Sequence, residues 1–149
     1  MAAGIYSGIA VALGTGEVMT LRIAIPVWEG RVSPVLDVAE RLLLVDVDRG
    51  REVSRRVEAV GSGLLPERVR RMSDLGVSVV ICGTVSRQMA VMLSSLGIKV
   101  FPCMRGEVDE VLSSVVKAGA PDPRFFMPGY DGRPGRRRRR ARRGRSGWC

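Results

Sequence analysis

The chain has 149 residues, 46% of them hydrophobic, and a mean hydropathy of +0.10, which is enough apolar material for one domain with one core. The formal net charge of +9 would suggest nucleic-acid binding by the whole protein, but its location argues otherwise. Nine of the 24 basic residues lie beyond position 132, where no acidic residue occurs, and positions 1–132 hold 15 residues of each sign. The part expected to fold is therefore neutral, and the excess charge lies on a tail.

The amino-terminal segment carries no targeting signal that we can identify. Its apolar run, residues 5–13, is too short to span a bilayer and has no basic residue before it, so we expect neither a signal peptide nor a membrane partner. Residues 1–20 are interpreted as an extension, either disordered or created by a start codon placed too early, because Met19 directly precedes the first strand. Three cysteines without a signal peptide predict reduced thiols in the cytoplasm rather than a disulfide framework.

The first predicted strand begins at Arg22. Ile23, Ile25 and Val27 lie on one side of a period-2 pattern, and the small Ala24 lies on the other. Apolar residues on both sides of a strand are typical of an α/β sheet that is covered on both faces.

A constrained loop follows this strand, from residue 28 to residue 34. Pro26 cannot donate to a strand ladder, so we expect it at the exit of the strand. Gly30 permits a sharp reversal, and Ser33-Pro34 favours an extended step. Ligands bind at the carboxyl ends of strands in open α/β sheets, so the loop is a candidate binding site. A tight connection without function is an equally weighted alternative.

A β-hairpin is predicted next, from residues 42–48 and 51–57, with Gly50 in the left-handed conformation at the turn. Asp46 and Asp48 alternate outward on its first strand. Such a pair of carboxylates can bind a divalent ion, but a solvated strand face is the favoured interpretation.

Three helices are predicted by apolar residues at helical spacing: residues 66–75, the segment that Ser86 caps and that ends near residue 96, and residues 107–118. In the second of these, Met89, Met92, Leu93 and Leu96 are expected to face the sheet. In the first, the arginines are expected to form the solvated face: Arg68, Arg70 and Arg71. Residues 121–129 contain too many prolines for a helix and are expected to be extended.

An internal repeat joins the last two predicted strands. Residues 75–82 and 96–103 each contain a helix end, a glycine and a buried strand that ends in cysteine, at a constant offset of 21 residues. A helix of this length between strands predicts a right-handed crossover and parallel strands. If the strands are neighbours, Cys82 and Cys103 lie side by side at the carboxyl edge. Burial of both cysteines as small hydrophobic residues is the more probable alternative by composition.

These observations define a candidate rim at the carboxyl edge of the sheet, made of the loop 28–34, the turn 83–86 and the two cysteines. Cys82 and Cys103 are the candidate metal ligands, because soft thiolates suit iron–sulfur and copper sites. The turn 83–86 can bind an anion through backbone N–H groups, but a simple helix cap is favoured. The candidate cofactor-binding residues are Trp28, Arg31, Ser33, Gly83, Thr84 and Ser86.

From residue 130 the sequence consists almost entirely of glycine and arginine, and we expect residues 130–149 to be a disordered tail. Its nine arginines can contact RNA, DNA or an acidic partner, and a purely solubilising tail is equally weighted. Trp148 and Cys149 at its end are weak evidence for a site.

Taken together, several segments resemble the dinitrogenase iron-molybdenum cofactor biosynthesis family, whose members are small carriers related to nitrogenase accessory factors. The resemblance covers residues 21–129 and depends on the following segments: IAIPV at 23–27, GRVSPVLDVA at 30–39, LLLVDVD at 42–48, VVICGTVSR at 79–87, LGIKVFP at 96–102 and FMPG at 126–129.

The resemblance implies a ribonuclease-H-like three-layer α/β sandwich, with a mixed five-stranded sheet of order 3-2-1-4-5 and one antiparallel strand. It also implies a non-catalytic protein that binds a metal–sulfur cluster or its precursor, of the iron-molybdenum cofactor kind, and passes it between donor and acceptor proteins. Nuclease activity is not implied, because such a nuclease needs clustered carboxylates for two metal ions and the first strand has none.

One departure from the family matters for ligation. Some nitrogenase carriers look to histidine for cluster attachment, and this chain has no histidine. Cysteines, carboxylates or backbone groups would have to replace it, and two thiols are half of a four-cysteine site. A cluster that is labile, externally ligated or shared in a dimer therefore fits better than a permanent one.

Three classes of function follow, in this order: a cluster carrier or assembly protein, a nucleic-acid-associated protein that binds through its tail, and an enzyme. The enzyme is the least favoured, because the sequence has no histidine base, nucleophile elbow or phosphate-binding loop.

Overall fold

The computed structural model describes residues 20–61, 63–119 and 122–128. The strands are β1 (Thr20–Trp28), β2 (Arg31–Val32), β3 (Arg41–Asp48), β4 (Arg51–Ala59), β5 (Val79–Ile81) and β6 (Lys99–Phe101). The helices are α2 (Leu65–Asp74), α3 (Arg87–Ser95) and α4 (Val108–Ala118), with short 3-10 helices at Leu36–Val38 and Pro123–Phe125. Apart from Thr20, which already belongs to β1, the predicted extension and the arginine tail lie outside the described residues.

A mixed sheet of six strands forms the middle of the molecule. Five strands follow the order β4-β3-β1-β5-β6, and β2 pairs with β1 outside this path. β5 and β6 run parallel to β1, whereas β3 and β2 run antiparallel to it. The mixed α/β architecture is confirmed, and β1 is central as expected. The count of five strands with one antiparallel member was wrong, because part of the predicted loop forms β2.

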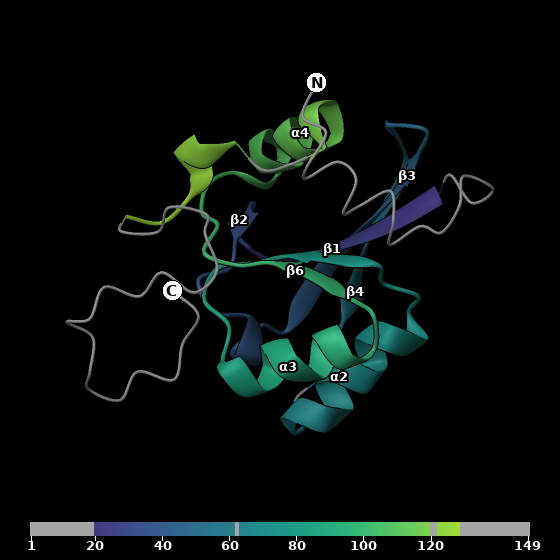
Figure 1. The fold of residues 1–149 in the computed structure, drawn as a ribbon, viewed down its shortest axis with the longest axis vertical. Coiled ribbons are helices and arrows are strands. Elements are labelled where there is room, and N and C mark those ends of the chain that lie inside the picture. The colour runs from purple at the N-terminus through teal and green to yellow at the C-terminus, as the bar shows by residue number, and fades with distance from the viewer. Residues whose placement is uncertain (1–19, 62, 120–121, 129–149) are drawn as a thin grey trace.

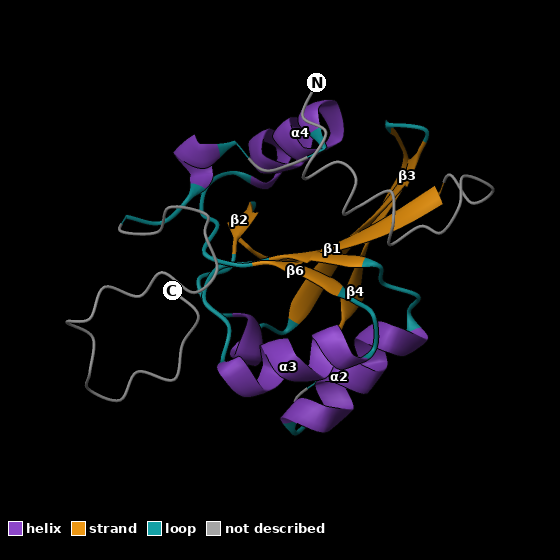
Figure 2. Cartoon of the chain, in the orientation of Figure 1, coloured by secondary structure: helices purple, strands orange, loops and turns teal. Residues whose placement is uncertain are grey.

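Helices cover both faces of this sheet (Figures 1 and 2). α4 lies on one face, and α2 and α3 lie on the other. Each face has its own core of buried side chains: one includes Ile23 and Ile25 with the inner side of α4, and the other includes Ala24 with α2 and α3. The predicted two-sided burial of the first strand is thus confirmed. None of the described helices is long and apolar enough to cross a membrane.

Pro26 lies inside β1 rather than at its exit. The strand continues to Trp28, and Pro26 is paired in register with Leu42 of β3. On the other side, the ladder between β1 and β5 ends at Ala24. β1 continues past Pro26 because β2 folds back on its last two residues and extends the pairing there.

The predicted hairpin is present and is longer than expected, because β4 extends to Ala59. Arg49 and Gly50 form its turn, both with positive φ (52° and 77°), as expected for a two-residue hairpin turn whose twist matches that of the strands. The register shifts by one residue between Asp46 and Val47, which is a β-bulge in β4.

Arg68 is the main error in the predicted helix faces. Its side chain is only 5% exposed, and its guanidinium donates hydrogen bonds to the carbonyl oxygens of Ala39 and Gly61. Arg70 and Arg71 are exposed, as expected. Arg68 therefore joins α2 to the segments that precede β3 and follow β4.

The other two helices match the predicted pattern closely. α4 buries Val108, Val111, Leu112 and Val115, and it ends at Gly119 with a φ of 72°. In α3, Met89 and Leu93 are buried and Met92 is partly buried, but Leu96 is 52% exposed. Leu96 faces solvent because the helix ends at Ser95, one residue before it.

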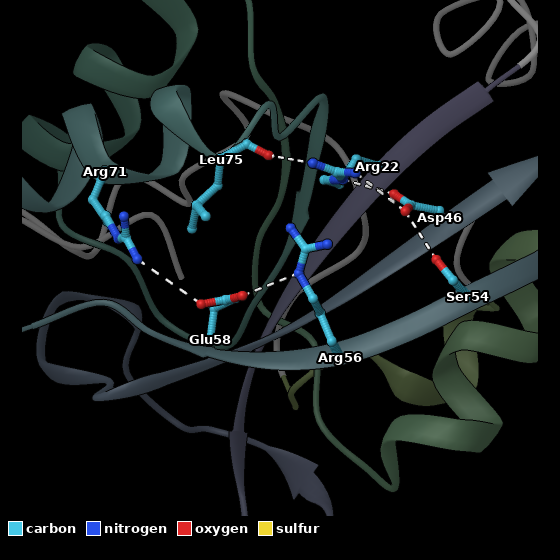
Figure 3. Close-up of polar contacts among 7 residues, drawn as sticks. All are labelled: Arg22, Asp46, Ser54, Arg56, Glu58, Arg71 and Leu75. Atoms are coloured by element: carbon cyan, nitrogen blue, oxygen red, sulfur yellow. Dashed lines mark hydrogen bonds and ion pairs between the residues drawn. The ribbon is translucent and has the colours of Figure 1, made fainter.

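A network of polar contacts joins α2 to the sheet (Figure 3). Arg22 on β1 donates to both carboxylate oxygens of Asp46 on β3, at 2.7 and 3.2 Å, and to the carbonyl oxygen of Leu75 at 2.7 Å. The Ser54 hydroxyl on β4 donates to the same carboxylate at 2.9 Å. Asp46 is thus an ion-pair partner, and the described residues include no group of three potential metal ligands around it or elsewhere.

We expect Asp46→Asn to lower the free energy of unfolding by about 1 kcal/mol at neutral pH. The hydrogen bonds from Arg22 and Ser54 hold the pKa of the Asp46 carboxyl below its usual value. A depressed pKa stabilises the folded state above the unfolded-state pKa, and this stabilisation is lost as the pH falls below about 4. Urea unfolding of both proteins at neutral and acidic pH measures the effect.

Asp48→Asn is the matched control on the same strand, because the described residues show no ion pair for Asp48. An equal loss of stability in both variants at neutral pH would contradict the assigned role of the Arg22–Asp46 pair.

Candidate functional site

The predicted loop after β1 is a β-hairpin. Val27 pairs with Val32 and Trp28 with Arg31, and the turn consists of Glu29 and Gly30, with φ angles of 50° and 76°. A Cβ atom on Gly30 would meet no atom within 4 Å, so its positive φ, rather than crowding, accounts for a glycine here. Trp28 is 65% exposed and Arg31 is exposed, so both side chains are open to a ligand.

Backbone hydrogen bonds join the segment after β2 to the segment after β5. The Thr84 amide and hydroxyl both donate to the Pro34 carbonyl oxygen, at 2.7 and 2.8 Å. The Leu36 amide donates in return to the Thr84 carbonyl oxygen at 2.9 Å. The Ser33 amide donates to Pro26 at 2.7 Å, and Ser33 is buried. These contacts fix two segments that are 50 residues apart in sequence.

Gly83 allows this close approach. A Cβ atom at position 83 would lie 2.7 Å from the Ser33 carbonyl oxygen and 2.5 Å from that of Pro34. Both contacts are with backbone atoms, which cannot move aside as a flexible side chain can. The residue at position 83 must therefore be glycine for these two segments to pack as they do.

Ser86 is the N-cap of α3, as the favoured interpretation expected. Its hydroxyl accepts a hydrogen bond from the Met89 amide at 3.2 Å. Its own amide donates to the carboxylate of Asp37 at 2.8 Å. A carboxylate of the same chain thus occupies the helix N-terminus, where an external anion would otherwise be favoured.

Two further segments complete this edge of the sheet. The Val32 amide donates to the Gly106 carbonyl oxygen at 2.9 Å, and the Val108 amide donates to Gly30 at 3.1 Å. Residues 103–105 pair in turn with residues 125–127. Arg31 and Glu107 form an isolated bridge, so the exposed Arg105 lies in the segment next to Arg31. The sequence analysis missed Arg105, because no motif marks it.

The two cysteines do not occupy equivalent positions. In the ladder between β5 and β6, Val79 pairs with Lys99 and Ile81 with Phe101, which is an offset of 20 residues. The repeat has an offset of 21, so the pairing continues from Cys82 to Pro102 and from Gly83 to Cys103. The Cys103 amide accordingly donates to the Gly83 carbonyl oxygen at 2.9 Å. The expectation that the sulfurs lie side by side was wrong by one residue.

Neither cysteine presents a thiolate to this edge. Cys82 belongs to the core beneath α2 and α3 and has no exposed surface. Burial, with a smaller contribution from the charge of Asp37, raises the pKa of its thiol far above the usual value. Cys103 is also buried, and it is disulfide-bonded, contrary to the expectation of three reduced cysteines. The structure gives a site with these two metal ligands no support.

The candidate cofactor-binding residues thus separate into two groups. Ser33, Gly83, Thr84 and Ser86 are brought together, but their contacts are mainly with the protein itself. Trp28 and Arg31 lie on the neighbouring hairpin and are exposed. Trp148 and Cys149 lie outside the described residues.

The model of one protein family, "Dinitrogenase iron-molybdenum cofactor", matches residues 19–118 of this chain. The chain belongs to this family. The match begins at the residue before β1 and ends with α4, so it includes the whole sheet and all three helices. No match was found among the curated proteins.

Solved structures show that the family fold extends to distant relatives. The crystal structure of PH0822 is 21% identical, with a TM-score of 0.66, and the alignment covers 75% of this chain and 97% of that chain. The apo form of the orange protein from Desulfovibrio gigas is 21% identical, with a TM-score of 0.56 and coverage of 67% and 90%. A protein of Methanocaldococcus jannaschii is 17% identical, with a TM-score of 0.57 and coverage of 66% and 89%.

Gly83→Ala is expected to lower the free energy of unfolding by about 1 to 3 kcal/mol, because the added Cβ overlaps two backbone carbonyl groups. The change should also separate the segments, so hydrogen exchange at the amides of Thr84 and Leu36 should become faster. Urea unfolding and amide exchange measure the two effects.

Gly97→Ala is the control. Gly97 also follows a helix, but its Cβ would enter open space, so only its φ of 77° opposes a side chain. This variant should lose about 1 kcal/mol without faster exchange at Thr84 or Leu36. Unchanged exchange in Gly83→Ala would contradict the role given to Gly83.

Cys82→Ser is expected to destabilise the protein by about 1 to 3 kcal/mol, because it places a hydroxyl in an apolar core. Cys82→Ala removes the sulfur without adding a polar group and should be less harmful. Thermal unfolding of the two variants decides the point. A tolerated serine together with a harmful alanine would indicate that the sulfur has a polar partner.

Proposed function

We propose that this protein is a non-catalytic carrier or assembly factor for metal–sulfur clusters of the iron-molybdenum cofactor kind. The observation that carries the proposal is the match of the family model to the whole folded unit. A similar structure is that of the apo form of the orange protein, which agrees with a protein that binds a ligand and can release it. The partners are then the proteins that donate the cluster and those that accept it.

The residues present do not fit a resident cluster. The described part of the chain has no group of three histidine, cysteine or carboxylate side chains close enough to hold a metal ion. Cys82 is buried with a raised pKa, and Cys103 would have to be reduced before its sulfur could bind metal. The cluster is therefore cargo, and it must arrive with most of its ligands already in place.

The exposed side chains of the β1–β2 hairpin would form the contact surface for this cargo. Trp28 provides a large apolar face, and Arg31 and Arg105 provide positive charge on adjoining segments. Metal–sulfur clusters with sulfide or thiolate ligands are generally anionic, so arginine is a suitable partner. In this proposal Ser33, Gly83, Thr84 and Ser86 hold the hairpin in place rather than touching the metal.

Two finer assignments belong to the same proposal. The order of the strands and the helices on both faces support the ribonuclease-H-like class that the resemblance implies. A cytoplasmic location agrees with a cluster carrier. The nucleic-acid alternative depends on the arginine tail, which lies outside the described residues, and no observation favours it.

Anaerobic incubation of the full chain with iron and sulfide, or with molybdate, sulfide and copper, should give a charge-transfer absorbance that stays with the protein on desalting. The double variant Trp28→Ala/Arg31→Ala should retain much less of this absorbance while unfolding at the same temperature, because both side chains are exposed. Absorbance and bound metal, measured together after desalting, test the prediction.

Arg51→Gln is the matched control, because Arg51 is exposed at the opposite end of the sheet. It should bind cargo as the parent protein does. Absence of bound metal under every condition would overturn the carrier function. Equal binding by the parent and the double variant would place the cargo elsewhere.

The cysteine hypothesis is tested in the same assay. Cys82→Ala is expected to retain the absorbance, since the thiol lies in the core. Loss of the absorbance in a folded Cys82→Ala protein would restore Cys82 as a ligand, which would require the core beneath α3 to open.

A further inference from the structure

β4 is an edge strand that no other described strand covers. The sheet ends at β4, whose inner edge pairs with β3 along eight positions from Arg41 to Asp48. Eight of its nine residues are exposed, and Val57 is 54% exposed. A long open edge presents unpaired N–H and C=O groups and is a template for pairing with another strand.

Ion pairs hold this edge strand in position on both faces of the sheet. Arg55 bonds to Asp109 of α4 at 2.6 Å, on the face that α4 covers. On the other face Glu58 lies 3.0 Å from Arg56 and 3.9 Å from Arg71 of α2 (Figure 3). The strand is thus fixed between two helices while its outer edge stays open, which favours pairing with a preformed strand.

The charges along β4 select one way of pairing with a second copy of itself. In an antiparallel pair related by a two-fold axis, the residue on the axis faces its own copy. An axis at Arg55, Arg56 or Glu58 would place like charges directly opposite, which is destabilising. An axis at Ser54 would place the bulge, where Val53 has no partner, inside the new ladder.

An axis at Val57 avoids these conflicts. Val57 then faces Val57 of the second copy on the side of α4, as its pairing with Leu43 shows. On the other side, Arg56 faces Glu58 of the second copy, and Glu58 faces Arg56, so two pairs of opposite charge form. Arg55 faces Ala59 in both directions, without conflict.

We propose that this protein forms a homodimer in which two β4 strands pair antiparallel about Val57 and the two sheets become one. β4 runs parallel to β1, so the antiparallel arrangement directs the two Trp28–Arg31 hairpins to opposite ends of the dimer. Each copy keeps its own accessible hairpin. A cluster shared between the two copies is excluded by this geometry.

Sedimentation equilibrium of the full chain over a range of concentrations tests the dimer. The parent protein should show a reversible monomer–dimer equilibrium, and Arg56→Glu should raise its dissociation constant at least about tenfold by placing two glutamates opposite each other twice. Combining Arg56→Glu with Glu58→Arg restores opposite charges and should recover most of the affinity.

Arg51→Glu is the control, since it makes the same change of charge on β4 outside the paired segment. A monomer at all concentrations would overturn the proposal. A dimer that responds equally to Arg51→Glu and Arg56→Glu, or that the double exchange does not restore, would overturn it as well.

A cysteine at the axis tests the register directly. Residues directly opposite on antiparallel strands have Cβ atoms about 4.5 to 5.5 Å apart, so Val57→Cys should form a disulfide-linked dimer under mild oxidation that reducing agent reverses. Val53→Cys, on the same strand but in the bulge, should give no more linked dimer than the parent chain does through its own cysteines. Equal linkage by the two variants would contradict the register.

Discussion

The burial of β1 on both faces is the constraint on which the rest of the structure depends. One side of the strand contributes Ile23 and Ile25 to the core beneath α4, and the other contributes Ala24 to the core beneath α2 and α3. Its edges are paired with β3 and β5. Neither helical layer can move without disturbing this strand. The point at which the Trp28–Arg31 hairpin leaves the sheet is fixed as a result.

The edge from which this hairpin emerges is held mainly by backbone hydrogen bonds. Pro34, Thr84 and Leu36 are joined through main-chain groups, and Gly83 is the one position among these segments where a side chain would force them apart. The polar groups near the start of α3 are satisfied by Asp37 and Ser86. Such an edge has few groups left for chemistry on a substrate, whereas a rigid hairpin with an exposed tryptophan and arginine suits the binding and release of a preformed cargo.

Sequence patterns were a sound guide to the elements and a poor guide to how they meet. Alternation in residues 23–27 and helical spacing in residues 108–115 follow directly from burial, so both were predictable. Arg68 was not, because its partners are backbone carbonyl groups of Ala39 and Gly61, which leave no mark in the sequence. β2 was hidden for a similar reason, since two residues are too few to show a period.

The cysteines show a different limit. A repeat counts residues along the chain, whereas a ladder is set by which backbone groups pair, and here the two counts differ by one. Along a strand, a shift of one residue moves a side chain to the opposite face. The same reasoning gives the charge pattern of β4 its value. Arg56 and Glu58 are two residues apart on one face of a strand whose register to β3 is known, so their placement depends on an observed ladder rather than on a count along the chain.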